Sequence, residues 1–227
     1  MKISFVIPIY NAEKIIQETL DILNPSLQSM NLDYEILFRD DGSSDASCRL
    51  LSEISRRHSR VRCFYNDENR GLGFTLRHLF EDAEGEIIIY LDCDLPFGVE
   101  ILPSMIQEIL ENDIVVASRY AGESSKIPLM RKITSRAYYC LCHFLFSVNA
   151  RDIGSGTVAF RKESVRSLKL TSDRFDIHAE IFAKAYRMKL SVKELPARYR
   201  HGQRGSFSVF LHGPDVVMDT FKLWKRL

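Results

Sequence analysis

The chain has 227 residues, a length that suits one enzyme-sized α/β domain. Its 31 Lys and Arg residues nearly balance its 30 Asp and Glu residues, so bulk charge excludes a strongly basic nucleic-acid-binding protein and we expect no nucleic-acid partner. Five cysteines without paired spacing argue against a disulfide framework or a zinc site and favour a reducing compartment.

The N-terminus carries no recognisable targeting pattern. The chain runs directly into the apolar residues 3–7, without the regions of a signal peptide. No segment approaches the ~18–20 apolar residues that a membrane span requires. We therefore expect a cytoplasmic protein, peripheral at the cytosolic face of a membrane.

Strand and helix patterns alternate through the first half of the chain. Apolar runs predict strands, and apolar residues at helical spacing predict helices. Pro25 is expected to end the first helix, and Ser44 or Asp45 to cap the second. In chain order, the pattern predicts a strand at 3–7, a helix over 15–23, a strand at 34–38, a helix around 50–54, a strand at 61–65, a helix at 74–82, a strand at 87–91, a helix at 101–110 and a strand at 114–117.

This repeat predicts a Rossmann-like α/β fold. The sheet is expected to be mostly parallel and doubly wound, with helices on both faces and ligands at the carboxyl ends of its strands. No linker divides the chain, so we expect one domain over residues 1–227, with a donor-binding half at 1–120 and an acceptor-binding half at 121–227.

The second half contains two amphipathic segments. Arg131, Lys132 and Arg136 precede the aromatic, apolar stretch 137–146, and residues 216–227 also mix apolar and basic side chains. A basic start with an aromatic continuation is typical of a helix in the headgroup region of a membrane, whereas a helix packed against the sheet would show similar residues. Both interpretations remain open for each segment.

The strand ends of the first half carry polar and aromatic residues. Asp92-Cys93-Asp94 follows the buried run 87–91, and two carboxylates placed there can bind a divalent cation that holds a diphosphate. Pro8-Ile9-Tyr10-Asn11 and Asp40-Asp41-Gly42-Ser43 end two further predicted strands. Together they predict one ligand-binding edge.

The order of these motifs resembles that of inverting family-two glycosyltransferases of GT-A fold, over nearly the whole chain. Within that family, the second half looks like dolichyl-phosphate mannosyltransferases and related polyprenyl-phosphate glycosyltransferases. The residues that carry the resemblance are Pro8–Asn11, Asp40–Asp45, Asn69–Gly71, Asp92–Asp94, Val116–Tyr120, Arg131 with Ser135, Asp152–Gly156 with Phe160-Arg161, and Glu180-Ile181 with Lys184-Ala185.

The resemblance implies a donor site. Pro8 and Tyr10 would lie beside the nucleotide base, and Asp41 would accept a hydrogen bond from the base edge. Asp92 and Asp94 would face the diphosphate through Mg²⁺ or Mn²⁺, whose preference for oxygen ligands suits both groups. The metal would offset the charge that develops on the departing nucleoside diphosphate.

The resemblance also implies an anion-binding set of arginines. Arg119 and Arg131 would grip the phosphate of a lipid acceptor with the bidentate geometry that guanidinium offers, and Ser135 would add a hydroxyl donor. Arg200 or Arg204 would close on the donor diphosphate, with Arg200 slightly favoured.

The sequence departs from the family pattern at two places. Polyprenyl-phosphate enzymes often have a Gln two residues beyond the second Asp as a further metal contact, and this chain has Pro96. In the first loop, Ala12 takes the common Glu position and Glu13 follows it. Metal affinity and donor recognition are expected to differ accordingly.

The expected activity is metal-dependent inverting transfer of a hexose, mannose or glucose, from a GDP- or UDP-sugar to a polyprenyl monophosphate. The expected partners are the membrane surface or a membrane protein that holds the enzyme there. One alternative is a saccharide or glycolipid hydroxyl acceptor, for which Asp176 or Glu180, near His178, would be the base. Another is a catalytically silent subunit that binds nucleotide sugar. The sequence identifies neither the sugar nor the base.

Overall fold

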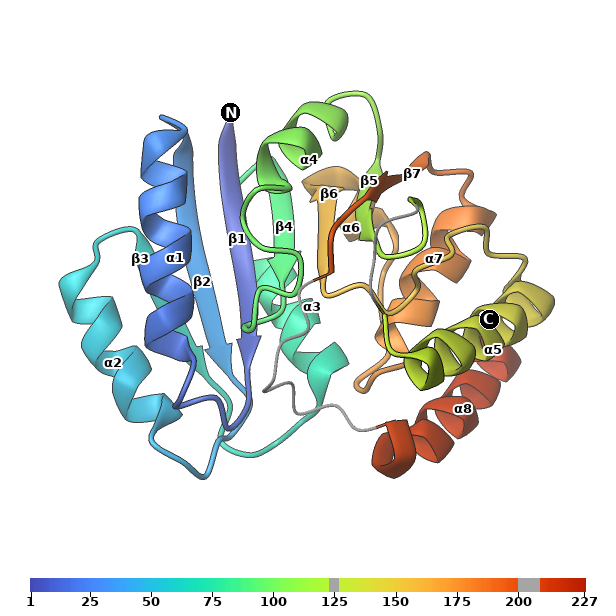
Figure 1. Cartoon of the computed structure of the whole chain (residues 1–227). Helices are drawn as coiled ribbons and strands as arrows, with labels where there is room; N and C mark the ends of the chain where they lie inside the picture. The colour runs from blue at the N-terminus through green and yellow to red at the C-terminus, as the bar shows by residue number, and fades with distance from the viewer. Residues whose placement is uncertain (123–126, 200–208) are drawn as a thin grey trace.

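The computed structural model describes residues 1–122, 127–199 and 209–227. Seven strands form one sheet in the order β3-β2-β1-β4-β6-β5-β7, with helices on both faces (Figure 1). The strands are β1 (Lys2–Ile9), β2 (Asp33–Asp40), β3 (Val61–Tyr65), β4 (Ile87–Leu91), β5 (Ile114–Ser118), β6 (Thr157–Arg161) and β7 (Val192–Pro196). The helices are α1 (Ile16–Ser29), α2 (Ser47–Arg57), α3 (Leu72–Asp82), α4 (Leu102–Glu108), α5 (Leu129–Phe146), α6 (Lys162–Ser167), α7 (Ile177–Arg187) and α8 (Val209–Arg226).

All strand pairings in the sheet are parallel except those of β6. Strand β6 runs antiparallel to both β4 and β5, and it separates them. The predicted α/β class and mostly parallel sheet are therefore confirmed. Because β6 enters where its neighbours end, the residues before it reach the same edge of the sheet as the ends of β1, β2, β4 and β5.

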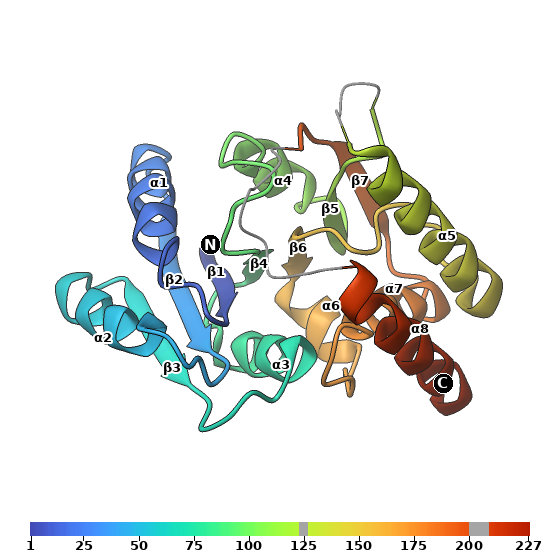
Figure 2. The same ribbon diagram turned by 60° about the horizontal axis from the view of Figure 1, so that its bottom comes forward.

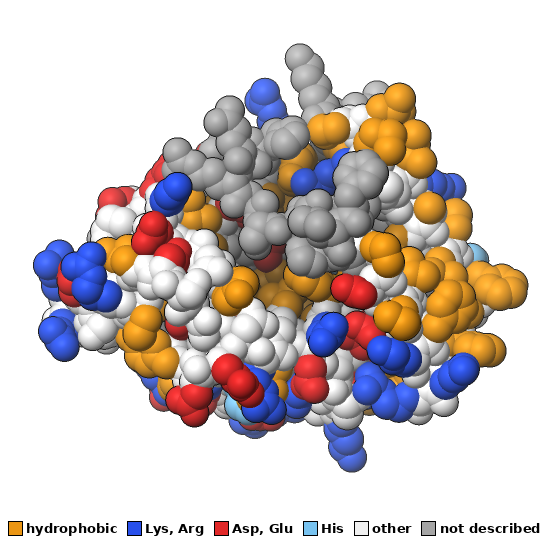
Figure 3. Space-filling view, turned by 90° about the horizontal axis from the view of Figure 1, so that it is seen from below, with side chains coloured by type: hydrophobic (Ala, Val, Ile, Leu, Met, Phe, Trp, Pro, Cys, Tyr) orange, Lys and Arg blue, Asp and Glu red, His pale blue; other side chains and the backbone are white. Residues whose placement is uncertain are grey.

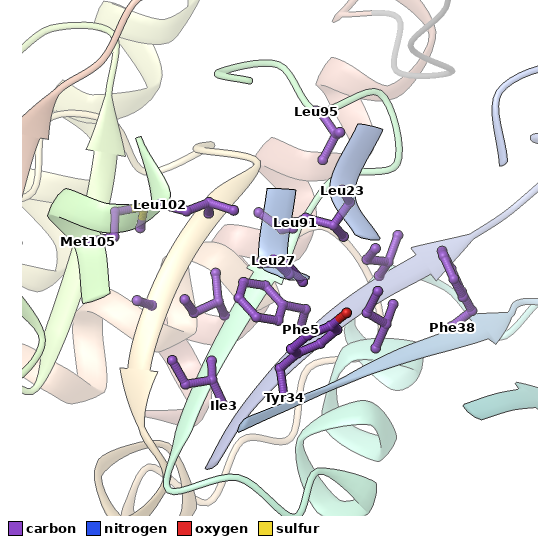
Figure 4. Close-up of a cluster of buried hydrophobic side chains, with 14 of the residues drawn as sticks. Ile3, Phe5, Leu23, Leu27, Tyr34, Phe38, Leu91, Leu95, Leu102 and Met105 are labelled. Carbon is purple, nitrogen blue, oxygen red and sulfur yellow. The ribbon is translucent and has the colours of Figure 1, made fainter. Parts of the chain in front are cut away.

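Two hydrophobic clusters cover the two faces of the sheet. One cluster joins the odd-numbered residues of β1 to α1, α2 and α4, and Figure 4 shows part of it around Phe5 and Leu27. The other joins α3, α5, α6, α7 and α8 to the opposite face, and Tyr90 and Phe160 are among its buried members. The alternation of side chains along β1 explains why its residues divide between both clusters.

Helix α1 corrects one expectation from the sequence. Pro25 lies inside the helix rather than at its end, and α1 continues to Ser29. Pro25 is exposed, so the Asp21 carbonyl that loses its partner lies on the solvent side, while the buried Leu27 holds the next turn against the sheet. Helix α2 begins after Ala46 without a side-chain cap, although Asp45 Oδ1 accepts the N–H of Ser47 at 2.9 Å.

Helices α5 and α8 lie side by side, as Figures 1 and 2 both show. The Tyr138 hydroxyl and Thr220 Oγ1 are 3.0 Å apart across their contact, and Cys142 and Leu223 are buried beneath it. Within the described ranges, no helix has both the length and the apolar character needed to cross a bilayer.

Candidate active site

The loop after β1 is tied to the loop after β2. The Asn11 N–H donates to Ser43 Oγ at 2.8 Å, and Asn11 Oδ1 accepts the N–H of Ser44 at 2.9 Å. Tyr10 precedes this link and is 43% exposed, whereas Pro8 is only partly exposed. The structure therefore presents an aromatic ring at the strand end where the nucleotide base is predicted to lie, on a backbone held in place by two hydrogen bonds.

Asp41 is buried and holds the loop that leads to α3. Its Oδ1 accepts hydrogen bonds from the Asn66 amide at 2.8 Å and the Arg70 N–H at 2.9 Å, and its Oδ2 accepts the Gly71 N–H at 2.9 Å. Gly71 has a φ of 95°, a conformation that favours glycine. Asp41 is thus an anchor for this loop, and its contact with a base stays a prediction.

Glu13, which follows the position where the family commonly has Glu, has a structural role in the loop before α1. Glu13 Oε2 accepts the N–H of Ala46 at 2.9 Å, so this carboxylate supports the start of α2. The Glu13 N–H in turn donates to Asp45 Oδ2 at 3.0 Å. The carboxylate that follows the usual Glu position therefore joins the first two helices of the fold.

Asp92 is held at the floor of the site. The Tyr90 hydroxyl donates to Asp92 Oδ1, and the Asp92 N–H donates to the Gly156 carbonyl at 2.7 Å. A Cβ placed on Gly156 would lie 2.0 Å from Asp92 Oδ2, so only glycine fits there. Burial raises the pKa of Asp92, while Tyr90 and the charges of Arg119 and Arg131 lower it.

Asp94 has fewer neutralising partners. Burial and the nearby charge of Asp92 raise its pKa to about 6, against a smaller lowering effect of Arg131. Two such carboxylates provide hard oxygen donors whose charge a divalent cation would neutralise. No third His, Cys, Asp or Glu joins them in the described ranges, so a cation held here would complete its shell with diphosphate oxygens and water. The pair fits the predicted Mg²⁺ or Mn²⁺ on these terms, without a ligand at the buried Pro96.

Arg119 follows β5 and forms a buried ion pair with Asp152. Its backbone N–H and its Nε both donate to Asp152 Oδ2, at 2.8 and 2.9 Å, and its Nη2 donates to Asp152 Oδ1 and to the Gly154 carbonyl. Only 6% of Arg119 is exposed. The structure thus places a fixed cation beside Asp92, and much of its hydrogen-bonding capacity is already used. Its predicted grip on an acceptor phosphate stays a prediction.

Arg131 reaches the same site from the first turn of α5. Its Nη1 donates to the Tyr199 hydroxyl at 2.5 Å, and its charge lowers the pKa of both Asp92 and Asp94. The structure therefore brings Arg119, Arg131 and the two aspartates together from three separate segments. Arg200 and Arg204 lie outside the described residues.

Helix α7 contributes a histidine beneath the aspartates. The His178 ring stacks on Tyr90 with centroids 6.0 Å apart, and its buried Nε2 has no hydrogen-bond partner within the residues that the structure describes. Burial lowers the pKa of His178 to about 4, so the ring is neutral near pH 7. The sequence placed His178 only near Asp176 and Glu180, because a contact with a strand end 88 residues earlier has no local pattern.

The two acids considered as a general base are both engaged elsewhere. Glu180 is fully buried and accepts hydrogen bonds from the Thr171 and Ser172 N–H groups at 2.7–3.0 Å, and Lys184 pairs with it at 2.7 Å. Burial opposes the charge of Glu180, yet these donors hold its pKa below the ordinary value. Asp176 accepts the Ser172 hydroxyl at 2.7 Å, and burial raises its pKa.

The structure gives roles to three further residues for which the sequence predicted none: Tyr90, Asp152 and Tyr199. Asp152 belongs to the segment Asp152–Gly156, which contributes to the family resemblance, but the sequence did not predict its ion pair with Arg119. Tyr90 lies in the strand before the two aspartates, on the same face as Asp92, and strand alternation is the signal that would have found it. Tyr199 precedes the basic segment at 200–206 and had no signal of its own.

Comparisons with known proteins agree with this arrangement. The chain is 30% identical over 210 residues to a dolichol-phosphate mannosyltransferase of Pyrococcus furiosus, covering 90% of this chain and 58% of that protein. It is 27% identical to glycosyltransferase AglD of Haloferax volcanii, covering 86% of this chain and 32% of that protein. The chain thus spans about a third to three fifths of the length of these relatives.

Solved structures share the fold at low identity. Mannosyltransferase PcManGT of Pyrobaculum calidifontis, in complex with GDP-Man and Mn²⁺, superposes with a TM-score of 0.69 at 16% identity, over 99% of this chain and 64% of that one. Glucosyl-3-phosphoglycerate synthase of Mycobacterium tuberculosis, in complex with Mn²⁺, UDP-glucose and phosphoglyceric acid, gives 0.71 at 16% identity, over 99% and 80%. The model of glycosyl transferase family 2 matches residues 4–169, from β1 past β6 and including Asp92, Asp94, Arg119 and Arg131, and the chain belongs to that family, with the GT-A fold.

Proposed function

We propose that this protein transfers one hexose, mannose or glucose, from a GDP- or UDP-sugar to a polyprenyl monophosphate, with inversion at the anomeric carbon. The observation that carries the proposal is the meeting of Arg119 and Arg131 at a pair of aspartates, while Glu180 and Asp176, the two acids considered as a base, are held by other partners. A phosphate acceptor is already ionised near neutral pH, so it needs orientation and charge compensation rather than proton removal.

The reaction is a single displacement. An oxygen of the lipid phosphate forms a bond to the anomeric carbon as the bond from that carbon to the diphosphate breaks, and the electron pair leaves with the nucleoside diphosphate. Asp92 and Asp94 would hold Mg²⁺ or Mn²⁺, which supplies charge neutralisation for the diphosphate when bound. Arg131 and Arg119 lower the repulsion between the two anions that must approach each other.

The similarities support this acceptor class. One relative is named a dolichol-phosphate mannosyltransferase, and a structural neighbour was solved with GDP-Man and Mn²⁺. The saccharide alternative needs a base, and the backbone donors around Glu180 favour a structural role for that residue.

The surface of α5 and α8 supports a location at an anionic membrane surface. We call this surface the apolar helix face; its exposed side chains are Leu129, Met130, Ile133 and Phe144 of α5 and Val217, Met218, Phe221 and Trp224 of α8. Figure 3 shows hydrophobic side chains gathered on this side, with Lys and Arg side chains along its border. Phe144 is 85% exposed, and α5 carries no acidic residue. Such a face fits the headgroup region of a bilayer, next to the site that Arg131 shares.

The experiment that tests the activity is transfer of radiolabelled sugar from a panel of GDP- and UDP-sugars, with Mg²⁺ or Mn²⁺, into short polyprenyl phosphates. We expect label in an organic-extractable lipid, lost in Asp94→Asn and Arg131→Ala and retained in Arg136→Ala, an exposed arginine of the same helix. Donor hydrolysis that needs metal and Asp94 but not Arg131, without lipid label, would overturn the lipid acceptor. Donor binding without any turnover would indicate a silent subunit.

Membrane association has its own test. Sedimentation with vesicles of phosphatidylcholine and phosphatidylglycerol is expected to capture the protein, and Phe144→Ser with Trp224→Ser to reduce capture by ~10-fold. Tyr186→Ser, at an exposed aromatic residue of α7, is the matched control. Equal capture of all variants would show that the apolar helix face does not meet the bilayer.

A further inference from the structure

Tyr199 lies where three segments of the candidate site meet. It follows β7 by three residues and is partly buried. Its hydroxyl accepts the hydrogen bond from Arg131 of α5. Its ring forms a T-shaped pair with Phe97, which belongs to the loop after Asp94, with centroids 5.9 Å apart. The Tyr199 side chain therefore contacts both α5 and the loop that follows Asp94.

The Tyr199 ring also contacts both arginines of the site. The guanidinium of Arg131 lies 4.9 Å from the ring centroid, and that of Arg119 lies 5.5 Å from it. An electron-rich ring face attracts each of these positive charges. The one ring therefore helps to hold both cations at the site before an anion binds.

The two arginines depend on this contact to different degrees. Arg119 is fixed independently by Asp152 and Gly154. Arg131 extends from the first turn of a largely exposed helix, and its Nη1 donates to the Tyr199 hydroxyl. A long side chain on such a helix samples many rotamers, and ordering it upon ligand binding would weaken affinity.

We propose that Tyr199 is a positioning residue that holds the Arg131 guanidinium in the orientation needed to bind the acceptor phosphate. The inference rests on the proposed function, because it assigns Tyr199 a part in capturing that phosphate. The Tyr199 hydroxyl holds one nitrogen of the Arg131 guanidinium by a hydrogen bond, and the Tyr199 ring contacts the same guanidinium. The remaining N–H groups of Arg131 are therefore ordered before the phosphate binds.

Two substitutions separate the hydroxyl from the ring. Binding of a short prenyl monophosphate is measured by calorimetry, and KM for acceptor and donor is measured by sugar transfer. Tyr199→Phe is expected to raise the acceptor Kd and KM by ~5-fold through loss of the hydrogen bond, and Tyr199→Leu by ~30-fold through loss of the ring as well. The donor KM and the thermal midpoint stay near those of the wild type. Tyr186→Phe and Tyr186→Leu are the matched controls.

A double-mutant cycle tests whether Tyr199 acts through Arg131. In the Arg131→Ala background, Tyr199→Phe is expected to cause no further loss of prenyl phosphate binding, because the group that it orients is gone. Equal losses in both backgrounds, or wild-type acceptor affinity in Tyr199→Leu, would overturn the inference while leaving the transferase activity intact. A wild-type protein that neither binds prenyl phosphate nor transfers sugar to it would overturn the proposed acceptor and the inference together.

Discussion

Two acids from different segments, the buried Glu180 and the partly buried Asp94, differ in how their charge is satisfied. Glu180, in the first turn of α7, accepts fixed N–H donors from Thr171 and Ser172 and an ion pair from Lys184, which hold its pKa low. Asp94, after β4, is partly buried near the carboxylate of Asp92, and its pKa rises to about 6. An acid whose charge is met by the protein stabilises the fold. An acid whose charge is left unbalanced favours a cation brought from outside.

The largest expected effect is on catalysis at Asp94. Asp94→Asn removes the charge that would hold the metal and its diphosphate, and sugar transfer is expected to fall by about 10²- to 10³-fold. The free energy of unfolding should not fall, since the substitution removes repulsion with Asp92. Initial rates with saturating donor, together with urea unfolding, measure both. If Asp94→Asn kept its rate of sugar transfer but lost stability, Asp94 would serve the fold, as we infer for Glu180, and not the metal.

Glu180→Gln is expected to show the opposite pattern. The amide replaces an acceptor oxygen with a donor that faces backbone N–H groups, so the free energy of unfolding should fall by about 2–3 kcal/mol. The kcat of the folded fraction with a lipid phosphate should stay within ~2-fold of the wild type. Urea denaturation and active-site-normalised rates provide the measurement. Abolished transfer at unchanged stability would instead assign Glu180 as a general base and favour a hydroxyl acceptor.

A smaller effect is expected at Asp41, which resembles Glu180 in its backbone partners. Asp41→Asn should cost about 1–2 kcal/mol through the Arg70 and Gly71 N–H groups and should weaken binding of the nucleoside diphosphate by loosening the adjacent loop. Nucleotide titration by calorimetry, compared with urea unfolding, separates the two effects. Weakened nucleotide binding without any loss of stability would point to direct contact between Asp41 and the base.

The smallest effect is a dependence of stability on pH. The pKa of Asp94 is raised from 3.8 to about 6 in the folded protein, so the native state binds this proton more readily than the unfolded state. The contribution of Asp94 to stability is therefore unfavourable above pH 6 and improves as pH falls toward 4. Asp94→Asn should melt about 2–4 °C above the wild type at pH 7.5, with the difference shrinking by pH 4.5. A constant difference across this range, by differential scanning fluorimetry, would contradict the raised pKa.

The sequence predicted the first half of the fold well because its signals are local. Strands β1 to β5 have apolar runs, and the pattern also located the polar ends of β1, β2 and β4. The end of α1 was predicted wrongly because proline usually ends a helix. Here the burial of Leu27 against the sheet, which the local sequence does not reveal, keeps the chain helical beyond Pro25. Strand β6 was not predicted, because its place between β4 and β5 depends on pairing with residues 70 positions earlier.

The candidate site was predicted in part for the same reason. Asp92 and Asp94 stand next to a strand, and their motif is visible in the chain. The partner of Arg119 is Asp152, 33 residues away, and no spacing rule connects the two. The anchoring of Asp41 by Asn66, Arg70 and Gly71 also required the fold, because a carboxylate before a glycine predicts only a turn.

The antiparallel strand β6 has a consequence for how the protein is made. Until residues 157–161 leave the ribosome, β4 can pair only with β1, and β5 has neither of its neighbours, β6 and β7; both strands carry fully buried apolar sequences. A nascent chain that ends near residue 120 therefore exposes one unpaired edge of β4 and both edges of β5, which are prone to pair with other chains. The time taken to translate residues 120–160 therefore bears on how long the facing edges of β4 and β5 stay unpaired, and Gly156, which makes room for Asp92, arrives just before the strand that covers them.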